Sequence, residues 1–383
     1  MNLTNPLFWK SLTFSGAAVA FIVVSAWWLY FSPLKGDLRP VSRPSPRLSG
    51  WLAALLGLSA IQLVSGAFWD ASMHLQTGEV PAGADFLWPP HLVIYSAFLL
   101  SFTVAGIAIG LVARSGWRAG QRDPRRWVRR NPTLGAVALA SLYALLSIPG
   151  DALWHALYGI DLTAWSPPHV ILGVSSCTVL ICALGLLAQS RAAAVRPGLH
   201  DAATLGLLSL MLNVAYMIGV IEWELPGVSN PLVDARPIWS YPLVGGALAF
   251  FTLLLAKRLV AFRWAATVTA GAFYLLRLTI TAGLALTGNV VPFMPVWFIL
   301  GAILLDVIPW AQITSALVGD LAAAATFTAG YALLALPLLR LRAGLPAFTS
   351  FDLGMSIAAT LAASLLLLPV VRLASTRLRG QGR

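Results

Sequence analysis

The sequence predicts an all-α fold, a polytopic bundle of about eleven transmembrane helices with repeated helical hairpins in its N-terminal half. Hydrophobic residues make up 58% of the 383 residues and charged residues make up 10%, against about 25% charged residues in an average soluble domain. Apolar runs of bilayer-crossing length, about 20 residues each, recur along the whole chain. These observations exclude a soluble globular enzyme, a disordered chain and a disulfide scaffold.

The expected spans follow one another from the N-terminus. The first begins after Lys10 and has no small-residue cleavage site behind its apolar core, so we expect a retained helix rather than a signal peptide. The ninth contains three prolines and Asp306, so we expect a broken or re-entrant helix there. The other runs meet the length and apolar character that a spanning helix needs. The eleven runs lie at 14–32, 50–69, 91–113, 133–150, 169–189, 203–222, 240–256, 264–286, 292–310, 319–338 and 353–372.

Lys and Arg gather in alternate loops, and this pattern predicts the orientation in the membrane. The loops at 70–90 and 151–168 contain neither residue. The positive-inside rule therefore places the N-terminus outside and the C-terminus inside a bacterial cytoplasmic membrane, with Arg340 and Arg342 as exceptions unless the ninth run is re-entrant. Since topology accounts for the net charge of +11, we expect no nucleic-acid partner. The basic loops are 33–49, 114–132, 190–202 and 257–263.

Three regions are expected along the chain. Residues 1–48 hold the first helix and a cytoplasmic loop, and residues 49–200 hold a duplicated pair of hairpins. Residues 201–383 hold C-terminal helices that serve as a scaffold or as a partner surface. The expected surroundings are the lipid bilayer, with partner membrane subunits or a homo-oligomer as the two alternatives for further contacts.

Four of the five histidines lie in two copies of one sequence pattern. The copies read D-x3-H-x16-H and D-x3-H-x13-H, and a Pro-Pro pair stands directly before the last His of each copy. Asp and His at positions i and i+4 share one face of a helix. Because Pro is favoured in the first turn of a helix, each Pro-Pro-His opens a new span. The residues of the two copies are Asp70, His74 and His91, and Asp151, His155 and His169.

Each copy is therefore expected to bring one carboxylate and two imidazoles together at the extracytoplasmic membrane boundary. This set of ligands suits Cu, Zn, Fe or Ni and leaves coordination positions open, which favours catalysis or transfer over a structural role. If the two hairpins pack about a pseudo-symmetry axis, the triads form one dinuclear site; otherwise they form two mononuclear sites. A proton relay and simple capping of helix ends are the alternatives.

The second copy, Asp151, His155 and His169, resembles the copper-ligand motif of the C subunit of particulate methane monooxygenase and ammonia monooxygenase. In that family an Asp and two His bind copper inside a bundle of membrane helices, with the second spacing one residue shorter than here. The first copy matches with a longer loop. The resemblance covers about 20 residues per copy, and the family has one motif per chain and works with partner subunits. It implies copper as cofactor and oxidation of a small apolar substrate.

Five further residues are candidates for an accessory role. Asp85 and Asp161 lie in the outer loops, where they can orient an imidazole N–H. A third copy that has lost its last His is suggested by residues 239–243, whose sequence Trp-Ser-Tyr-Pro-Leu resembles Trp-Ser-Pro-Pro-His at 165–169. Glu222 and Glu224 precede it, near where the Asp and first His would stand, and can donate a carboxylate. Arg277 is a charge inside a predicted span, where a functional role is the first hypothesis.

The partner of Arg277 has two candidates. One is Asp306 in the ninth run, and the other is Glu222 or Glu224 near the outer boundary. A buried structural pair is the simpler interpretation of either arrangement.

The sequence therefore favours a membrane metalloprotein that binds copper, or alternatively iron or zinc, and acts as an oxidoreductase of the membrane monooxygenase type. The alternatives are a metal transporter and a non-catalytic subunit of a membrane oxidoreductase complex. The chain has no Walker loop, dinucleotide fingerprint or HExxH motif. A transporter needs a polar path, yet the spans that begin at His91 and His169 are almost wholly apolar.

Overall fold

The computed structural model describes most of the chain as helix. Over the described ranges no strand occurs, so the predicted all-α class is confirmed. These ranges are 6–33, 44–77, 87–158, 166–191, 197–225, 237–294, 298–308, 315–340 and 349–381.

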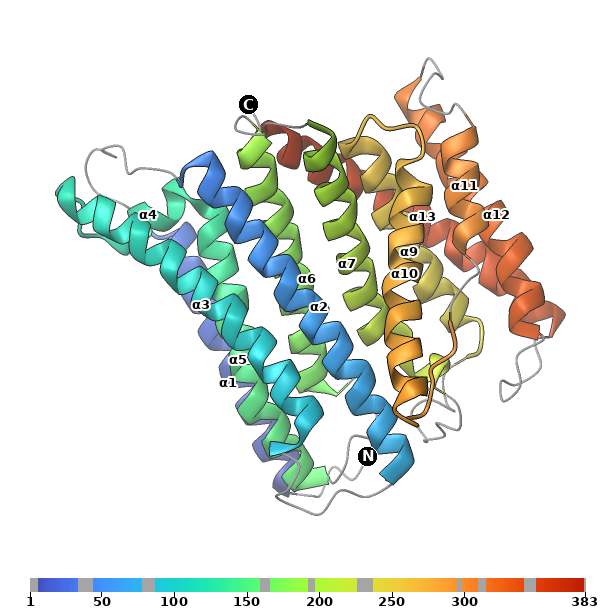
Figure 1. The fold of residues 1–383 in the computed structure, drawn as a ribbon, viewed down its shortest axis with the longest axis horizontal. Coiled ribbons are helices and arrows are strands. Elements are labelled where there is room, and N and C mark those ends of the chain that lie inside the picture. The colour runs from blue at the N-terminus through green and yellow to red at the C-terminus, as the bar shows by residue number, and fades with distance from the viewer. Residues whose placement is uncertain are drawn as a thin grey trace. The chain divides into compact units, whose positions relative to one another are not determined.

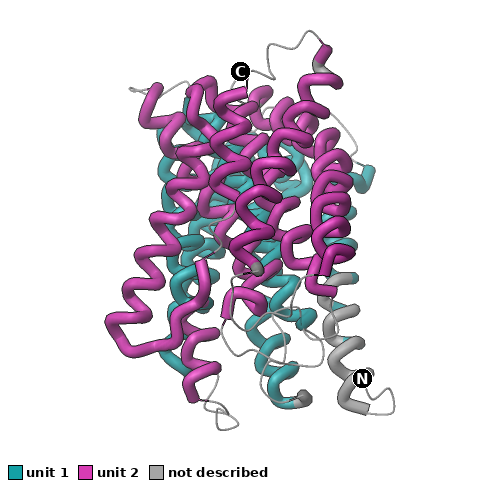
Figure 2. Tube along the Cα trace, turned by 90° about the vertical axis from the view of Figure 1, so that its right-hand side faces the viewer, with its two compact units in different colours: residues 1–67, 79–195 teal, residues 68–78, 196–383 magenta. Residues whose placement is uncertain are grey.

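The chain forms two compact units. Residues 1–67 and 79–195 make up unit 1, and residues 68–78 and 196–383 make up unit 2 (Figure 2). Helix α2 runs unbroken from Pro46 to Thr77, so it begins in the first unit and ends in the second.

Unit 1 is a bundle in which α5 packs against α6, α3 and α1 (Figure 1). Every helix of this unit starts at a proline, whose fixed φ and missing N–H suit the first helical position. Tyr30 at the end of α1 donates its hydroxyl to the carbonyl of Pro132 at the start of α5 (2.8 Å). The helices are α1 (Pro6–Tyr30), α2 (Pro46–Thr77), α3 (Pro89–Arg118), α4 (Pro124–Arg130), α5 (Pro132–Tyr158) and α6 (Pro167–Ser190).

The predicted basic loop after α3 contains the short helix α4. Asp123 caps this helix, because its carboxylate accepts the backbone N–H of Arg125 (2.9 Å). The guanidinium of Arg125 also lies 2.7 Å from the same carboxylate, and this hydrogen bond holds the pKa of Asp123 below its ordinary value. Arg129 donates to the carbonyl of Leu29 (2.8 Å), which ties α4 to the end of α1.

Unit 2 is built around α9, which packs against α13, α7 and α10. Its core is aromatic: the rings of Tyr216, Phe273 and Phe298 lie 5.0 to 5.6 Å apart and are fully buried. The helices are α7 (Pro197–Glu224), α9 (Ser240–Leu259), α10 (Ala265–Leu286), α11 (Ile299–Val307), α12 (Ala316–Arg340) and α13 (Ser350–Gln381).

Nine of the described helices are long and apolar enough to cross a membrane: α2, α3, α5, α6, α7, α9, α10, α12 and α13. Each coincides with one of the predicted spans, and this architecture fits an integral membrane protein. The first predicted run falls on α1, in which a shorter apolar stretch, Ala20–Tyr30, is identified. The orientation of the termini and the type of membrane stay predictions, and Arg342 lies outside the described residues.

The ninth predicted span is a broken helix. Gly288, with a φ of +72°, follows the end of α10, and residues 289–294 are not helical. The ring of Phe298 stacks on Tyr274, halfway along α10, at a centroid distance of 4.9 Å. Helix α11 then runs for only nine residues. A half-length helix preceded by non-helical backbone is what the prolines of this run predict.

Helix α11 ends beside the start of α10. Asp306 accepts the backbone N–H of Thr267 in the first turn of α10 (2.7 Å) and pairs with Lys257 near the end of α9 (3.0 Å). Asp320 in the early part of α12 pairs with Arg258, which follows Lys257 directly. Between the end of α10 and Asp306 the chain therefore passes along the length of α10 and reaches the level of its start. A re-entrant segment would return to the level at which α10 ends, so that alternative is wrong.

Candidate metal centre

In the second sequence copy one carboxylate lies close to both histidines within unit 1. Asp151 and His155 lie one turn apart near the end of α5, and their Oδ1 and Nε2 atoms are 3.8 Å apart. His169, in the first turn of α6, places its Nε2 atom 3.5 Å from the same Oδ1 atom. The three side chains are 10% to 23% exposed. One carboxylate oxygen thus faces two imidazole nitrogens from two helices, as the hairpin argument predicts.

Local structure at the start of α6 fixes the orientation of His169. Ser166 is the N-cap residue of this helix, and Pro167 and Pro168 occupy its first two positions. The Ser166 hydroxyl lies 3.0 Å from Nδ1 of His169. Because one ring nitrogen is engaged by Ser166, the other is turned toward Asp151. This hydroxyl is the kind of outer group that orients a metal-binding imidazole.

Among the described residues, the first copy is the group whose candidate ligand atoms all lie close to one another. Asp70 and His74 lie one turn apart in α2, with Oδ1 and Nε2 3.5 Å apart. One ligand atom from each of Asp70, His74 and His91 lies within 4.8 Å of the other two, so these three residues form a possible metal-binding group. Their side chains are partly or fully shielded, and His91 is only 5% exposed.

Close packing of α2 on the start of α3 explains this meeting. A Cβ atom added at Gly66 would lie 2.9 Å from Cγ1 of Ile94 and 3.2 Å from the backbone N of Ile94. Asp70 lies one turn beyond Gly66 in α2, and His91 lies one turn before Ile94 in α3. The glycine therefore lets the two helices approach where their metal-ligand candidates stand.

Within unit 1, one histidine of the first copy lies near one histidine of the second. The rings of His91 and His155 have their centroids 6.5 Å apart. His91 is flanked by Trp88 at 6.2 Å and by Tyr95 at 5.7 Å. This contact joins one residue of each copy, and the dinuclear site and the two mononuclear sites both stay predictions.

Positively charged side chains are absent from the two sequence segments that hold the candidate ligands. The candidate ligands supply two carboxylates and four imidazoles, and segments 70–90 and 151–168 contain no Lys or Arg. Solvent does not reach Oδ1 of Asp70, Oδ1 of Asp151 or Nε2 of His155. Carboxylate and imidazole groups are both ligands of first-row metal ions, so the chemistry of these side chains fits such an ion.

Among the accessory candidates, Glu224 and Arg277 form a buried ion pair in unit 2. The guanidinium of Arg277 also stacks on the ring of Phe68 at 4.0 Å, two residues before Asp70 in α2. Of the two predicted pairings, the one with Glu224 is confirmed. Pairing with Asp306 is wrong, because Asp306 lies at the first turn of α10, about 16 Å along the helix from Arg277.

The remaining accessory candidates are Glu222, Asp85 and Asp161. Glu222 is buried on α7 at 7% exposure. Asp85 and Asp161 lie outside the described residues, so their expected role stays a prediction.

Sequence reasoning missed two groups that hold the candidate ligands. Ser166 was detectable, since it stands three residues before His169 and directly before Pro-Pro, the position of a helix cap. The other group lies on the opposite face of α2 from Asp70. Ser72 donates to the carbonyl of Val290 (2.5 Å) and Gln76 donates to that of Gly288 (3.3 Å), within unit 2. No local sequence pattern predicts these contacts.

Comparison with known proteins gives no match: neither a protein family, nor a curated protein, nor a solved structure is found to be similar to this chain.

Proposed function

We propose that this chain is an integral membrane metalloprotein that binds copper through Asp and His at the extracytoplasmic membrane boundary. In this proposal the six ligands are those of the two sequence copies, and the bound metal carries out oxidoreductase chemistry of the membrane monooxygenase type. The observation that carries the proposal is the position of Asp151, whose Oδ1 atom lies 3.5 Å and 3.8 Å from the Nε2 atoms of His169 and His155.

A metal explains this geometry better than helix capping does. Asp70 and Asp151 each stand seven residues before the last residue of their helix. A carboxylate gains stability near the N-terminus of a helix, where backbone N–H groups are free, and not near the C-terminus. Each carboxylate faces an imidazole group from a second helix. A neutral imidazole offers a lone pair, whereas Lys or Arg would offer a fixed positive charge. A bound cation satisfies all of these groups at once.

Copper is proposed first for two reasons. Imidazole-rich sites bind copper strongly among the divalent first-row metals, and a carboxylate completes three ligands while positions stay open for oxygen. The resemblance of the second copy to the copper motif of the monooxygenase C subunit points the same way. Iron and zinc are the alternatives, and both accept the same ligands.

Transport of the metal across the membrane is the less favoured function. The predicted runs that build this part of the bundle, at 50–69, 91–113, 133–150 and 169–189, contain no Asp, Glu, Lys or Arg. An ion leaving the centre toward the other side of the membrane would cross apolar helix faces. Chemistry at a fixed metal centre therefore fits the sequence better than passage through the bundle.

The test is the metal content of the purified protein. We expect about one or two copper ions per chain after reconstitution, measured by elemental mass spectrometry. The double change His155→Ala/His169→Ala should lose most of this copper. His200→Ala is the matched control, because His200 is the one histidine outside the two copies and should keep the wild-type metal content. Absence of copper, iron and zinc from the reconstituted wild type would overturn the proposal.

A further inference from the structure

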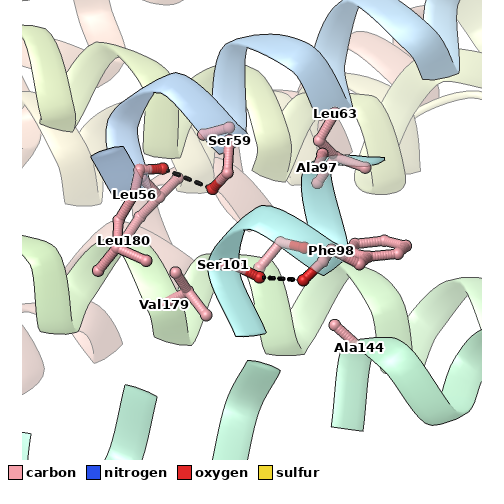
Figure 3. Close-up of a pocket in the computed structure, with 11 residues that line it drawn as sticks. Leu56, Ser59, Leu63, Ala97, Phe98, Ser101, Ala144, Val179 and Leu180 are labelled. Carbon is pink, nitrogen blue, oxygen red and sulfur yellow. Dashed lines mark hydrogen bonds between the residues drawn. The ribbon is translucent and has the colours of Figure 1, made fainter. Parts of the chain in front are cut away.

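A small cavity lies in unit 1 among helices α2, α3, α5 and α6 (Figure 3). Its volume is about 20 Å³, which admits one molecule of very few heavy atoms. The residues around it are Leu56, Ser59, Ala60, Leu63, Ala97, Phe98, Ser101, Ala144, Ser176, Val179 and Leu180.

The helical register places this cavity two turns along the helices from the candidate metal ligands. Phe98 follows His91 by seven residues in α3, and Ser176 follows His169 by seven residues in α6. In α5, Ala144 precedes Asp151 by the same number. Seven residues are close to two turns, so each pair shares a helix face and is separated by about 10 Å along the axis.

Helix α2 repeats the relationship. Leu63 lines the cavity and precedes Asp70 by seven residues in the same helix. All four helices that carry candidate ligands therefore contribute a cavity residue two turns deeper on the same face. The cavity is thus a feature of the helix faces that bear the ligands, rather than a packing defect elsewhere in the bundle.

The wall of the cavity selects for an apolar occupant. The hydroxyls of Ser59 and Ser101 donate to carbonyls of their own helices, those of Leu56 (2.8 Å) and Phe98 (2.9 Å), as Figure 3 shows. Most of the remaining wall is Ala, Leu, Val and Phe. A buried water needs two to four polar partners, and this wall offers few, which favours an apolar guest.

We propose that this cavity binds a neutral apolar molecule the size of dioxygen and delivers it to the metal centre. The delivery part rests on the proposed function, since it needs a metal two turns away. In the simplest reaction, one electron passes from Cu(I) to O₂ and gives Cu(II) and superoxide. The occupancy part stands without any metal.

Xenon tests occupancy in metal-free protein. We expect ¹²⁹Xe resonances of the purified wild type to show saturable binding, which Ala144→Leu abolishes because the larger side chain fills the cavity. Leu63→Ala enlarges the cavity and should strengthen xenon binding, so the test does not depend on an overpacked variant alone. Ser96→Leu is the control, because Ser96 is exposed and stands beside Ala97 on α3. Equal xenon binding in all four proteins would overturn the proposal.

The rate of Cu(I) oxidation tests delivery. Cu(I)-loaded protein is mixed with O₂, and Cu(II) formation is followed by freeze-quench spin resonance. We expect Ala144→Leu to slow oxidation about tenfold, while Ser96→Leu matches the wild type. Unchanged oxidation in a variant that no longer binds xenon would refute delivery. If neither copper, iron nor zinc binds, the proposed function fails, and the xenon result still decides whether the cavity is a binding site.

Discussion

Asp151 and His169 come from different helices, α5 and α6, and yet the Oδ1 atom of the first lies 3.5 Å from the Nε2 atom of the second. The hydroxyl of Ser166 lies 3.0 Å from the opposite nitrogen of the same imidazole ring. The imidazole is therefore fixed on both sides, which is how proteins set the direction of a metal-binding lone pair.

The change Ser166→Ala should weaken copper binding by about tenfold to 100-fold, because His169 loses the group that orients its ring. Ser166→Thr keeps a hydroxyl at the same position and should restore most of the affinity. Competition with a chromophoric copper chelator measures both variants. Equal affinities in Ser166→Ala and the wild type would show that the hydroxyl has no part in orienting the imidazole.

The contact between α2 and α3 gives a second prediction. Gly66→Val should reduce both thermal stability and copper content, since its side chain would meet the backbone of Ile94 and separate Asp70 from His91. Gly106→Val is the control, because a Cβ at Gly106 meets nothing within 4 Å. Thermal unfolding and elemental analysis are measured on both proteins. A Gly66→Val protein with wild-type copper content would contradict the assignment of the first copy to the centre.

Much of the fold follows from local patterns. Apolar runs of bilayer length predict nine helices in their observed positions, and the Asp-x3-His and Pro-Pro-His spacings predict that Asp151, His155 and His169 meet. These inferences need only helix periodicity and a hairpin connection. The prolines of the ninth run likewise predict its break.

Contacts between distant segments could not be predicted in the same way. The pairing of Lys257 with Asp306 and the approach of His91 to His155 depend on how helices pack in three dimensions. Sequence spacing gives no distance across the bundle, so it left Arg277 with two candidate partners. Helix α4 could not be predicted, because its seven residues include four arginines and form no apolar run.

The ion pair of Arg277 and Glu224 yields a third prediction. Both side chains are buried, at 3% and 0% exposure, so removing one partner leaves a buried charge. Arg277→Met should therefore lower the free energy of unfolding by about 3–5 kcal/mol, while the double change Arg277→Met/Glu224→Leu should recover much of this loss. Thermal unfolding in detergent micelles compares the three proteins. A double variant as unstable as the single one would argue against a coupled pair.

The cap of α4 gives a prediction on pH. Because Arg125 holds the pKa of Asp123 below its ordinary value of 3.8, the pair stabilises the folded chain fully above that pH. This contribution is lost as the pH falls from about 4 toward the lowered pKa of the folded state.

Asp123→Ala should remove that acid-side dependence and cost about 1 kcal/mol at neutral pH, as loss of an N-cap does. Hydrogen exchange of the α4 amides at pH 3 and pH 7 measures the effect. Equal protection of wild type and Asp123→Ala at pH 7 would show that the cap does not hold this helix.

The central claim is that the histidines of the two sequence copies bind copper. X-ray absorption at the copper edge of reconstituted protein tests it most directly. We expect scattering from several imidazole nitrogens at about 2.0 Å, which weakens in His155→Ala/His169→Ala but not in His200→Ala; a dinuclear site adds a copper–copper vector near 3.5–4 Å. A copper spectrum with no imidazole scattering, or one that the double variant leaves unchanged, would contradict the claim.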